Sequence, residues 1–151
     1  MERCAECGAP AEPYSCDELF QVLLGLDHAR REPWGPLHGV SVSCYLLQHP
    51  GRLPADGGAR ARDLLRAYLE GGLDEVNQVV GRARRGNNHR VRGGSARRAG
   101  DGVPPQRGAP RSRFSVTLHE VAVDGSFPAA GFAERVRGWA AATLGEWGRG
   151  A

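Results

Sequence analysis

The sequence has 151 residues and contains no lysine, so all 20 of its basic side chains other than histidine are arginines. This absence excludes a P-loop lysine that grips phosphate, a Schiff-base lysine and a kinase-type catalytic lysine. Isoleucine is also absent, and no run of 18 apolar residues occurs, so no membrane-spanning helix is expected. The length fits a single domain.

The start of the chain, from Met1 to Cys7, lacks the apolar stretch of a secretory signal. We therefore expect a cytoplasmic protein. In that reducing compartment its four cysteines serve as free thiols or metal ligands and do not form disulfides.

Positive charge is concentrated in one segment. Arg82–Arg113 contains ten arginines and one acid, Asp101, which gives +9 against −6 for the rest of the chain. Residues 86–113 are rich in glycine and proline, and their only large apolar side chains are Val91 and Val103. Such a segment cannot bury enough surface to offset the entropy of ordering it. We predict a disordered basic linker over 86–113, a long flexible Arg/Gly-rich loop between 1–85 and 114–151.

The basic segment has an alternative role as an electrostatic arm. Arginine-rich flexible segments bind RNA or DNA by neutralising phosphates. No aromatic residue lies between Arg82 and Arg113, so base stacking is excluded and only a weak contact with nucleic acid or an acidic partner is expected.

Helical patterns dominate the first part of the chain. The capping box Ser15-x-x-Glu18 predicts a helix over 16–30. Residues 39–49 fit a helix by length, although Val40 and Val42 would also fit a strand. Asp56 is expected to cap a third helix that ends at 71–72, and Asp74 to cap a short fourth one.

After the linker, Phe114–Leu118 alternates apolar and polar residues and predicts a short extended piece. The last helix is the most regular, because its large side chains recur every three or four positions, at Phe132, Val136, Trp139, Thr143 and Trp147. The fold class predicted is mainly α, a small single-domain helical protein in which 114–151 packs back on the helices of 1–85.

The sharpest motif is the N-terminal knuckle Cys4-x-x-Cys7-Gly8, in which two thiolates in a tight turn can hold one metal ion. A thioredoxin-like redox pair would need a preceding strand, and only three residues precede Cys4. Unligated surface thiols are the remaining reading. Zinc is the metal expected.

A structural zinc ion requires four ligands. Cys16 is the best third ligand, because the first turn of a capped helix favours a thiolate, although a free cysteine is also commonly buried in a core. For the fourth, His49 is preferred, with His38 and Cys44 as alternates. Four protein ligands would make this a structural metal site. An open coordination position near His38 would make it a catalytic one, and the spacing of these residues in the sequence does not distinguish the two.

The carboxylates give no sign of acid–base catalysis. They concentrate at helix starts and on expected exposed faces, where dipole complementarity and solubility explain them. The residues concerned are Asp17, Glu18, Asp27, Asp56, Asp63, Asp74 and Glu75.

Taken in order, several motifs resemble a bacterial family of uncharacterised proteins, a domain of unknown function with a CxxCG start and a YxLQHP segment. These motifs are Cys4–Gly8, Ser15–Phe20, Tyr45–Pro50, Leu64–Gly72 and Arg135–Ala140. The resemblance covers roughly residues 4–80 and 114–147. It implies a small, mainly helical fold and draws attention to Cys4, Cys7, Cys16, His38 and His49, but it implies no activity.

Overall fold

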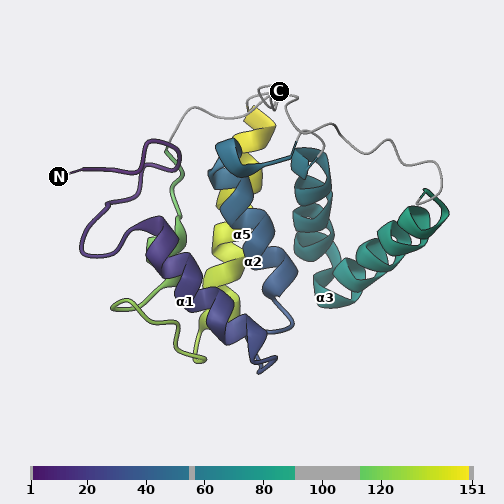
Figure 1. The fold of residues 1–151 in the computed structure, drawn as a ribbon, viewed down its shortest axis with the longest axis horizontal. Coiled ribbons are helices and arrows are strands. Elements are labelled where there is room, and N and C mark those ends of the chain that lie inside the picture. Colours follow the sequence, from purple (N-terminus) through teal and green to yellow (C-terminus); the bar gives the residue numbers. More distant parts are fainter. Residues whose placement is uncertain (1, 55–56, 91–112, 150–151) are drawn as a thin grey trace.

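The computed structural model describes residues 2–54, 57–90 and 113–149, with only the backbone described for 83–90 and 148–149. Within these ranges the protein is helical and forms no strand (Figure 1). The mainly α fold predicted from the sequence is therefore confirmed. Its elements in chain order are α1 (Cys16–His28), α2 (His38–Gln48), the 3₁₀ helix η1 (Pro50–Arg52), α3 (Gly57–Arg90), α4 (Leu118–Val121) and α5 (Phe132–Arg149).

The first helix begins where its cap predicts. The Ser15 hydroxyl accepts a hydrogen bond from the Glu18 backbone N–H at 3.1 Å, and Cys16 is the first helical residue. The helix ends at His28, two residues earlier than predicted, and Arg30 then adopts a left-handed φ of 54°. The helical reading of the next segment is correct, since α2 spans His38–Gln48.

Helix α3 is bent at Gly72, which has φ 70° and ψ −159° inside an otherwise helical run. The two parts of α3 meet there at a sharp corner (Figure 1). The predicted break at 71–72 is thus a kink, and the second part is much longer than the short helix expected after Asp74. The predicted cap at Asp56 lies outside the described residues.

The helix also continues into the first residues of the predicted linker. Gly86–Arg90 are helical. Each residue added to an existing helix gains one backbone hydrogen bond without the cost of starting a new helix, and no proline interrupts the helix here. The rest of the linker, 91–112, and with it most of the Arg82–Arg113 segment, lies outside the described residues.

The extended piece predicted at Phe114–Leu118 is wrong at its end. Thr117 caps α4, and Leu118 is its first helical residue. The Thr117 hydroxyl and the Glu120 carboxylate form a complete capping box. The same S/T-x-x-E/Q pattern precedes α1 at Ser15. Phe114–Val116 are neither helix nor strand.

The core lies where α2 packs against α3 and α5 (Figure 1). Trp139 and Trp147 of α5 are buried, and the Trp147 indole N–H donates to the Leu47 carbonyl at 2.8 Å. Gln48, at the end of α2, donates to the Val116 carbonyl at 2.7 Å and to the Thr143 hydroxyl at 2.9 Å. These bonds fix the end of α2, and the residues that follow it, against the C-terminal helix.

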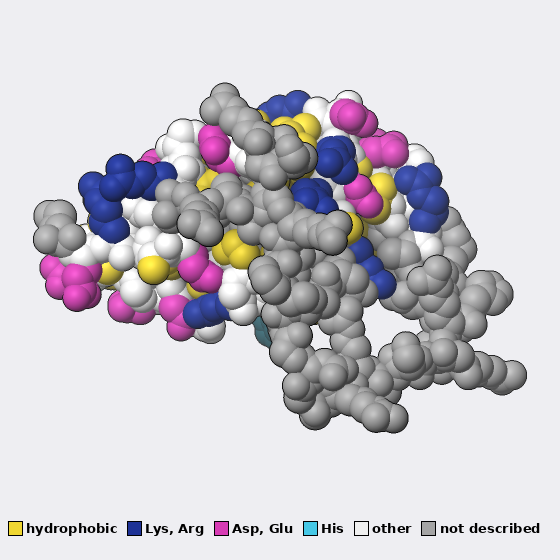
Figure 2. All heavy atoms as spheres, turned by 90° about the horizontal axis from the view of Figure 1, so that it is seen from above, with side chains coloured by type: hydrophobic (Ala, Val, Ile, Leu, Met, Phe, Trp, Pro, Cys, Tyr) yellow, Lys and Arg dark blue, Asp and Glu magenta, His cyan; other side chains and the backbone are white. Residues whose placement is uncertain are grey.

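On the face drawn in Figure 2, the described acidic and basic side chains are interspersed around scattered apolar groups. Among the described residues, no helix combines the length and the apolar character needed to cross a bilayer.

Candidate metal centre

The N-terminal knuckle is a closed turn. The Cys4 backbone N–H donates to the Ala9 carbonyl at 2.7 Å, and the Gly8 N–H donates to the Cys4 carbonyl at 2.9 Å. Gly8 has φ +83°, a left-handed conformation that glycine adopts without steric cost. The turn brings the side chains of Cys4 and Cys7 to the same side, with Cys7 1% exposed.

Cys16 enters the centre from the first turn of α1. Its Sγ lies 3.5 Å from the Sγ of Cys7, and both residues are buried. The Ser15 cap holds this turn, so the position of the thiol is set by a backbone that has little freedom.

His49 enters from the residue that follows α2. Its Nδ1 lies 2.7 Å from the Tyr45 carbonyl oxygen, which can only accept, so Nδ1 carries the ring proton and Nε2 has a free lone pair. That Nε2 is buried and has no hydrogen-bond partner in the described structure. The ring stacks on Tyr45, with centroids 4.2 Å apart, and Tyr45 stacks in turn on Phe20 at 3.8 Å.

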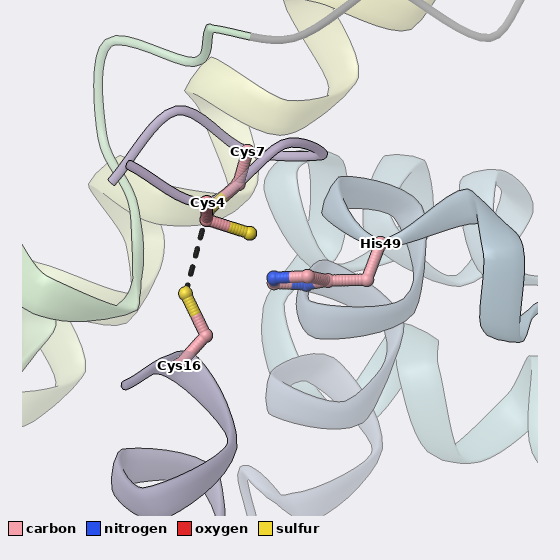
Figure 3. A group of neighbouring side chains, drawn as sticks. All are labelled: Cys4, Cys7, Cys16 and His49. Carbon is pink, nitrogen blue, oxygen red and sulfur yellow. Dashed lines mark hydrogen bonds between the residues drawn. The ribbon is translucent and has the colours of Figure 1, made fainter. Parts of the chain in front are cut away.

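These four side chains converge from three parts of the chain (Figure 3). The three sulfurs and an imidazole nitrogen of Cys4, Cys7, Cys16 and His49 all lie within 4.8 Å of one another. A tetrahedral ion with Zn–S bonds of 2.3 Å would hold its sulfurs about 3.8 Å apart. The spacing and the chemistry of the donors therefore fit one metal ion.

The thiols of Cys7 and Cys16 are within hydrogen-bonding distance of each other, with their sulfurs 3.5 Å apart. A hydrogen bond from the Cys16 thiol lowers the pKa of the Cys7 thiol to about 4. The same hydrogen bond, together with burial, raises the pKa of the Cys16 thiol. A metal ion in this position would displace the remaining thiol protons and offset the negative charge of the thiolates.

A cavity of about 250 Å³ borders the cluster on the side of Cys4, the most exposed of the four side chains. Its rim carries the ion pair of Arg52 with Asp17, at 3.0 Å. Glu6 belongs to the same wall, and its carboxylate accepts from the Gly51 backbone N–H at 2.8 Å. This bond ties the knuckle to η1.

The two alternate ligands lie elsewhere. His38 is at the start of α2, where its Nδ1 contacts Asp27 at 2.8 Å. Cys44 is fully buried in the core, and burial raises the pKa of its thiol. The structure does not bring His38 to the cluster, because His38 contacts Asp27 near the end of α1, whereas Cys16 is the first residue of that helix.

Two roles were not predictable from the residue types alone: that of Tyr45 beside the cluster and that of Asp27 near the other end of α1. The Tyr45 carbonyl fixes the His49 tautomer and could have been suspected from the i, i+4 spacing. Asp27, expected on an exposed face, is instead buried, because the start of α2 covers it. No local pattern in the sequence indicates that burial.

Comparison with known proteins gives one match. The model of a family of unknown function (DUF5946) matches residues 2–148 of the chain. No curated protein and no solved structure matches it significantly.

Proposed function

Since the chain belongs to the family of unknown function DUF5946, we propose its function from its own residues: it holds a structural zinc ion through Cys4, Cys7, Cys16 and His49. The observation that carries this proposal is the buried, unpartnered Nε2 of His49, directed at three thiols within 4.8 Å. A buried polar atom without a partner costs free energy, and a metal ion supplies the missing partner.

Zinc is the metal that best suits this donor set. Three thiolates and one imidazole form a Cys₃His set, which is typical of closed tetrahedral zinc sites. The Tyr45 carbonyl accepts from the other ring nitrogen of His49, the arrangement that commonly orients a histidine ligand. All four cysteines are free thiols, which suits the reducing cytoplasm that we infer as the protein's compartment.

A structural role follows from where the ligands come from. The knuckle contributes two, the start of α1 one and the end of α2 one. The knuckle is otherwise held by a few hydrogen bonds, including that of the Phe114 N–H to the Cys7 carbonyl at 3.2 Å. The ion would join it to two helices and contribute directly to the free energy of folding.

A metal-dependent enzyme is the second candidate, and the cavity beside Cys4 is the observation that favours it. Catalysis would require a water or substrate to take the place of one ligand. Cobalt substitution separates the two functions, because the absorption of Co²⁺ reports its coordination. A tetrahedral spectrum of three thiolates and one imidazole, unchanged by added azide or cyanide, supports the structural site.

The proposal is tested by counting zinc in two matched variants. Cys16→Ala and Cys44→Ala each remove one buried thiol, but only the first removes a proposed ligand. We expect about one zinc per chain in the natural protein and in Cys44→Ala, as a single four-ligand site requires. In Cys16→Ala we expect at least about a tenfold loss of zinc affinity, measured by competition with a chromophoric chelator.

Three results would contradict the proposal. The first is a folded natural protein that contains no zinc and takes up none when it is added. The second is equal zinc affinity in the two variants, which would mean that Cys16 is not a ligand. The third is loss of zinc from Cys44→Ala but not from Cys16→Ala, which would place the metal ion in the core and not at the proposed ligands.

A further inference from the structure

Two of the proposed ligands are in direct contact with each other. The Sγ atoms of Cys7 and Cys16 lie 3.5 Å apart, and the dashed line in Figure 3 marks this contact. The Cys4 sulfur points instead toward the His49 ring (Figure 3). A disulfide has an S–S bond of about 2.05 Å, so these two sulfurs need to approach by only about 1.5 Å to become bonded. Cys7 and Cys16 are therefore well placed to form one.

A small oxidant can reach one member of this pair. The cavity of about 250 Å³ beside the cluster is lined by Cys4 and Cys16 but not by Cys7, which is 1% exposed. Hydrogen peroxide contains only one more oxygen atom than water, and a water molecule takes up about 30 Å³ of liquid. The cavity therefore admits peroxide to the Cys16 sulfur, while the Cys7 sulfur lies outside the cavity wall and in contact with Cys16.

A zinc ion would keep the cluster thiols in their reactive form. Cysteine binds a metal as the thiolate, and the thiolate is also the form that attacks an oxidant. A sulfur in a disulfide carries no negative charge and no longer serves as a metal ligand. Binding of zinc by all four residues and a Cys7–Cys16 disulfide therefore exclude each other.

Cys44 shows what the cluster has that an ordinary buried thiol lacks. Cys44 is fully buried in the core and does not line the cavity. Burial raises the pKa of its thiol, so it stays protonated at neutral pH. An oxidant that acts through the cavity would leave this fourth cysteine unchanged.

We propose that hydrogen peroxide oxidises Cys16 and that Cys7 then forms a disulfide with it, which expels the zinc ion. This inference rests on the proposed function, because it concerns the same four ligands. In the first step the Cys16 thiolate attacks the O–O bond of the peroxide, so that a sulfenic acid forms and hydroxide leaves. In the second step the Cys7 thiolate attacks the Cys16 sulfur. The S–S bond then forms, the S–O bond breaks and a second hydroxide leaves.

Two electrons pass from the sulfurs to the peroxide oxygens. Solvent protonates the two hydroxides to water, and zinc leaves as Zn²⁺ with its oxidation state unchanged. The disulfide keeps the knuckle joined to α1, whereas the link through the ion to His49 at the end of α2 is lost. Reduction by a thiol regenerates both thiolates, so this redox switch is reversible.

The test follows zinc release and disulfide formation in the zinc-loaded natural protein. Zinc is counted first, hydrogen peroxide is then added, and free zinc is followed with a chromophoric chelator that removes none without peroxide. Cleavage after Glu6 and after Tyr14 places Cys4, Cys7 and Cys16 on separate peptides for mass spectrometry. We expect about one zinc released per disulfide formed, with Cys7 linked to Cys16, and about one zinc bound again after reduction by a thiol.

Two variants identify the sulfurs that react. Cys44→Ala removes a buried thiol outside the cluster, so its rate of zinc release should differ by less than about twofold, as expected for an independent site. Cys7→Ser removes the thiol that resolves the sulfenic acid. Dimedone, which traps sulfenic acids, should then label Cys16 several-fold more than in the natural protein.

A zinc-loaded protein that keeps its ion in peroxide overturns the redox switch and leaves the proposed function intact. Zinc release with a different pair of cysteines linked, or with sulfinic acid as the main product, overturns the switch as well. So does a Cys44→Ala variant that no longer responds to peroxide. A protein that binds no zinc before peroxide is added contradicts the proposed function itself, and the switch with it.

Discussion

His49 has its two ring nitrogens in different surroundings. One is fixed by the Tyr45 carbonyl, and the other is directed at three thiols. The ring itself lies on the face of Tyr45, which lies on Phe20. The orientation of this proposed ligand is therefore set by the packing of α1 against α2.

Gly8 provides a test of the knuckle at the scale of one residue. It adopts φ +83°, and a Cβ there would lie 3.0 Å from Cγ and 3.2 Å from Cα of Arg113. We expect Gly8→Ala to reduce the free energy of unfolding by about 1–2 kcal/mol or more, because the left-handed conformation alone costs this much. Chemical denaturation measures the change.

Gly138→Ala is the matched control. Gly138 is exposed within α5, and a Cβ there would meet nothing within 4 Å. Alanine should stabilise the protein by about 0.5–1 kcal/mol at this position. If both variants changed stability in the same direction, the account of Gly8 would be wrong.

Asp27 predicts a dependence of stability on pH. Burial raises the pKa of this carboxyl above its usual 3.8, and the hydrogen bond with His38 opposes part of the shift. The folded state then binds more protons than the unfolded state, so this group lowers stability as the pH rises from about 4 through the folded pKa. Asp27→Asn should abolish that loss.

The measurement compares the natural protein with Asp27→Asn by denaturation at several pH values. The charged groups that face Asp27 are His38, His28 and Arg30, and both proteins retain them. The difference in stability should grow in favour of the variant as the pH increases from 4. A difference that is constant with pH would show that Asp27 has an ordinary pKa.

At the scale of elements, α2 and α5 are joined through polar groups inside the core. Gln48 donates to the Thr143 hydroxyl, which itself donates to the Trp139 carbonyl at 2.7 Å. Thr143→Val preserves the shape of the side chain but removes the acceptor. We expect a loss of about 1–3 kcal/mol, because one buried N–H of Gln48 would lose its partner. Thermal denaturation measures it, and a neutral result would mean that Gln48 finds another acceptor.

The sequence predicts those elements whose signals are local. The caps at Ser15 and Thr117 and the glycine pair at 71–72 each act within one turn, so they can be recognised from residue types and spacing. Ser15 begins α1 and the glycine pair marks the kink in α3 as expected, whereas at Thr117 the alternating pattern of Phe114–Leu118 favours an extended segment over the capping box. The CxxCG turn is local in the same sense.

The candidate site is predictable only in part. Its fourth member depends on how α2 packs, since His38 and His49 at opposite ends of that helix are equally suitable by residue type. The burial of Asp27 likewise results from contact between the end of α1 and the start of α2, which are ten residues apart in the chain. Such contacts are properties of the tertiary structure.

At the scale of the whole molecule, zinc removal should destabilise the fold. A strong chelator is expected to lower the melting temperature by about 10 °C or more, since each kcal/mol is worth about 2–4 °C in a chain of this size. The Cys16→Ala variant, stripped of zinc before the measurement, serves as the control, and its melting temperature should not respond to the chelator. An equal fall in both proteins would indicate an effect of the chelator itself.

The bond between Trp147 and Leu47 joins residues 100 positions apart. During translation, α2 therefore leaves the ribosome long before the indole that covers its end has been synthesised. Until then the apolar side chains of α2 that pack against α5 have no partner to cover them. Synthesis of the last helix is thus the step that allows the core to close.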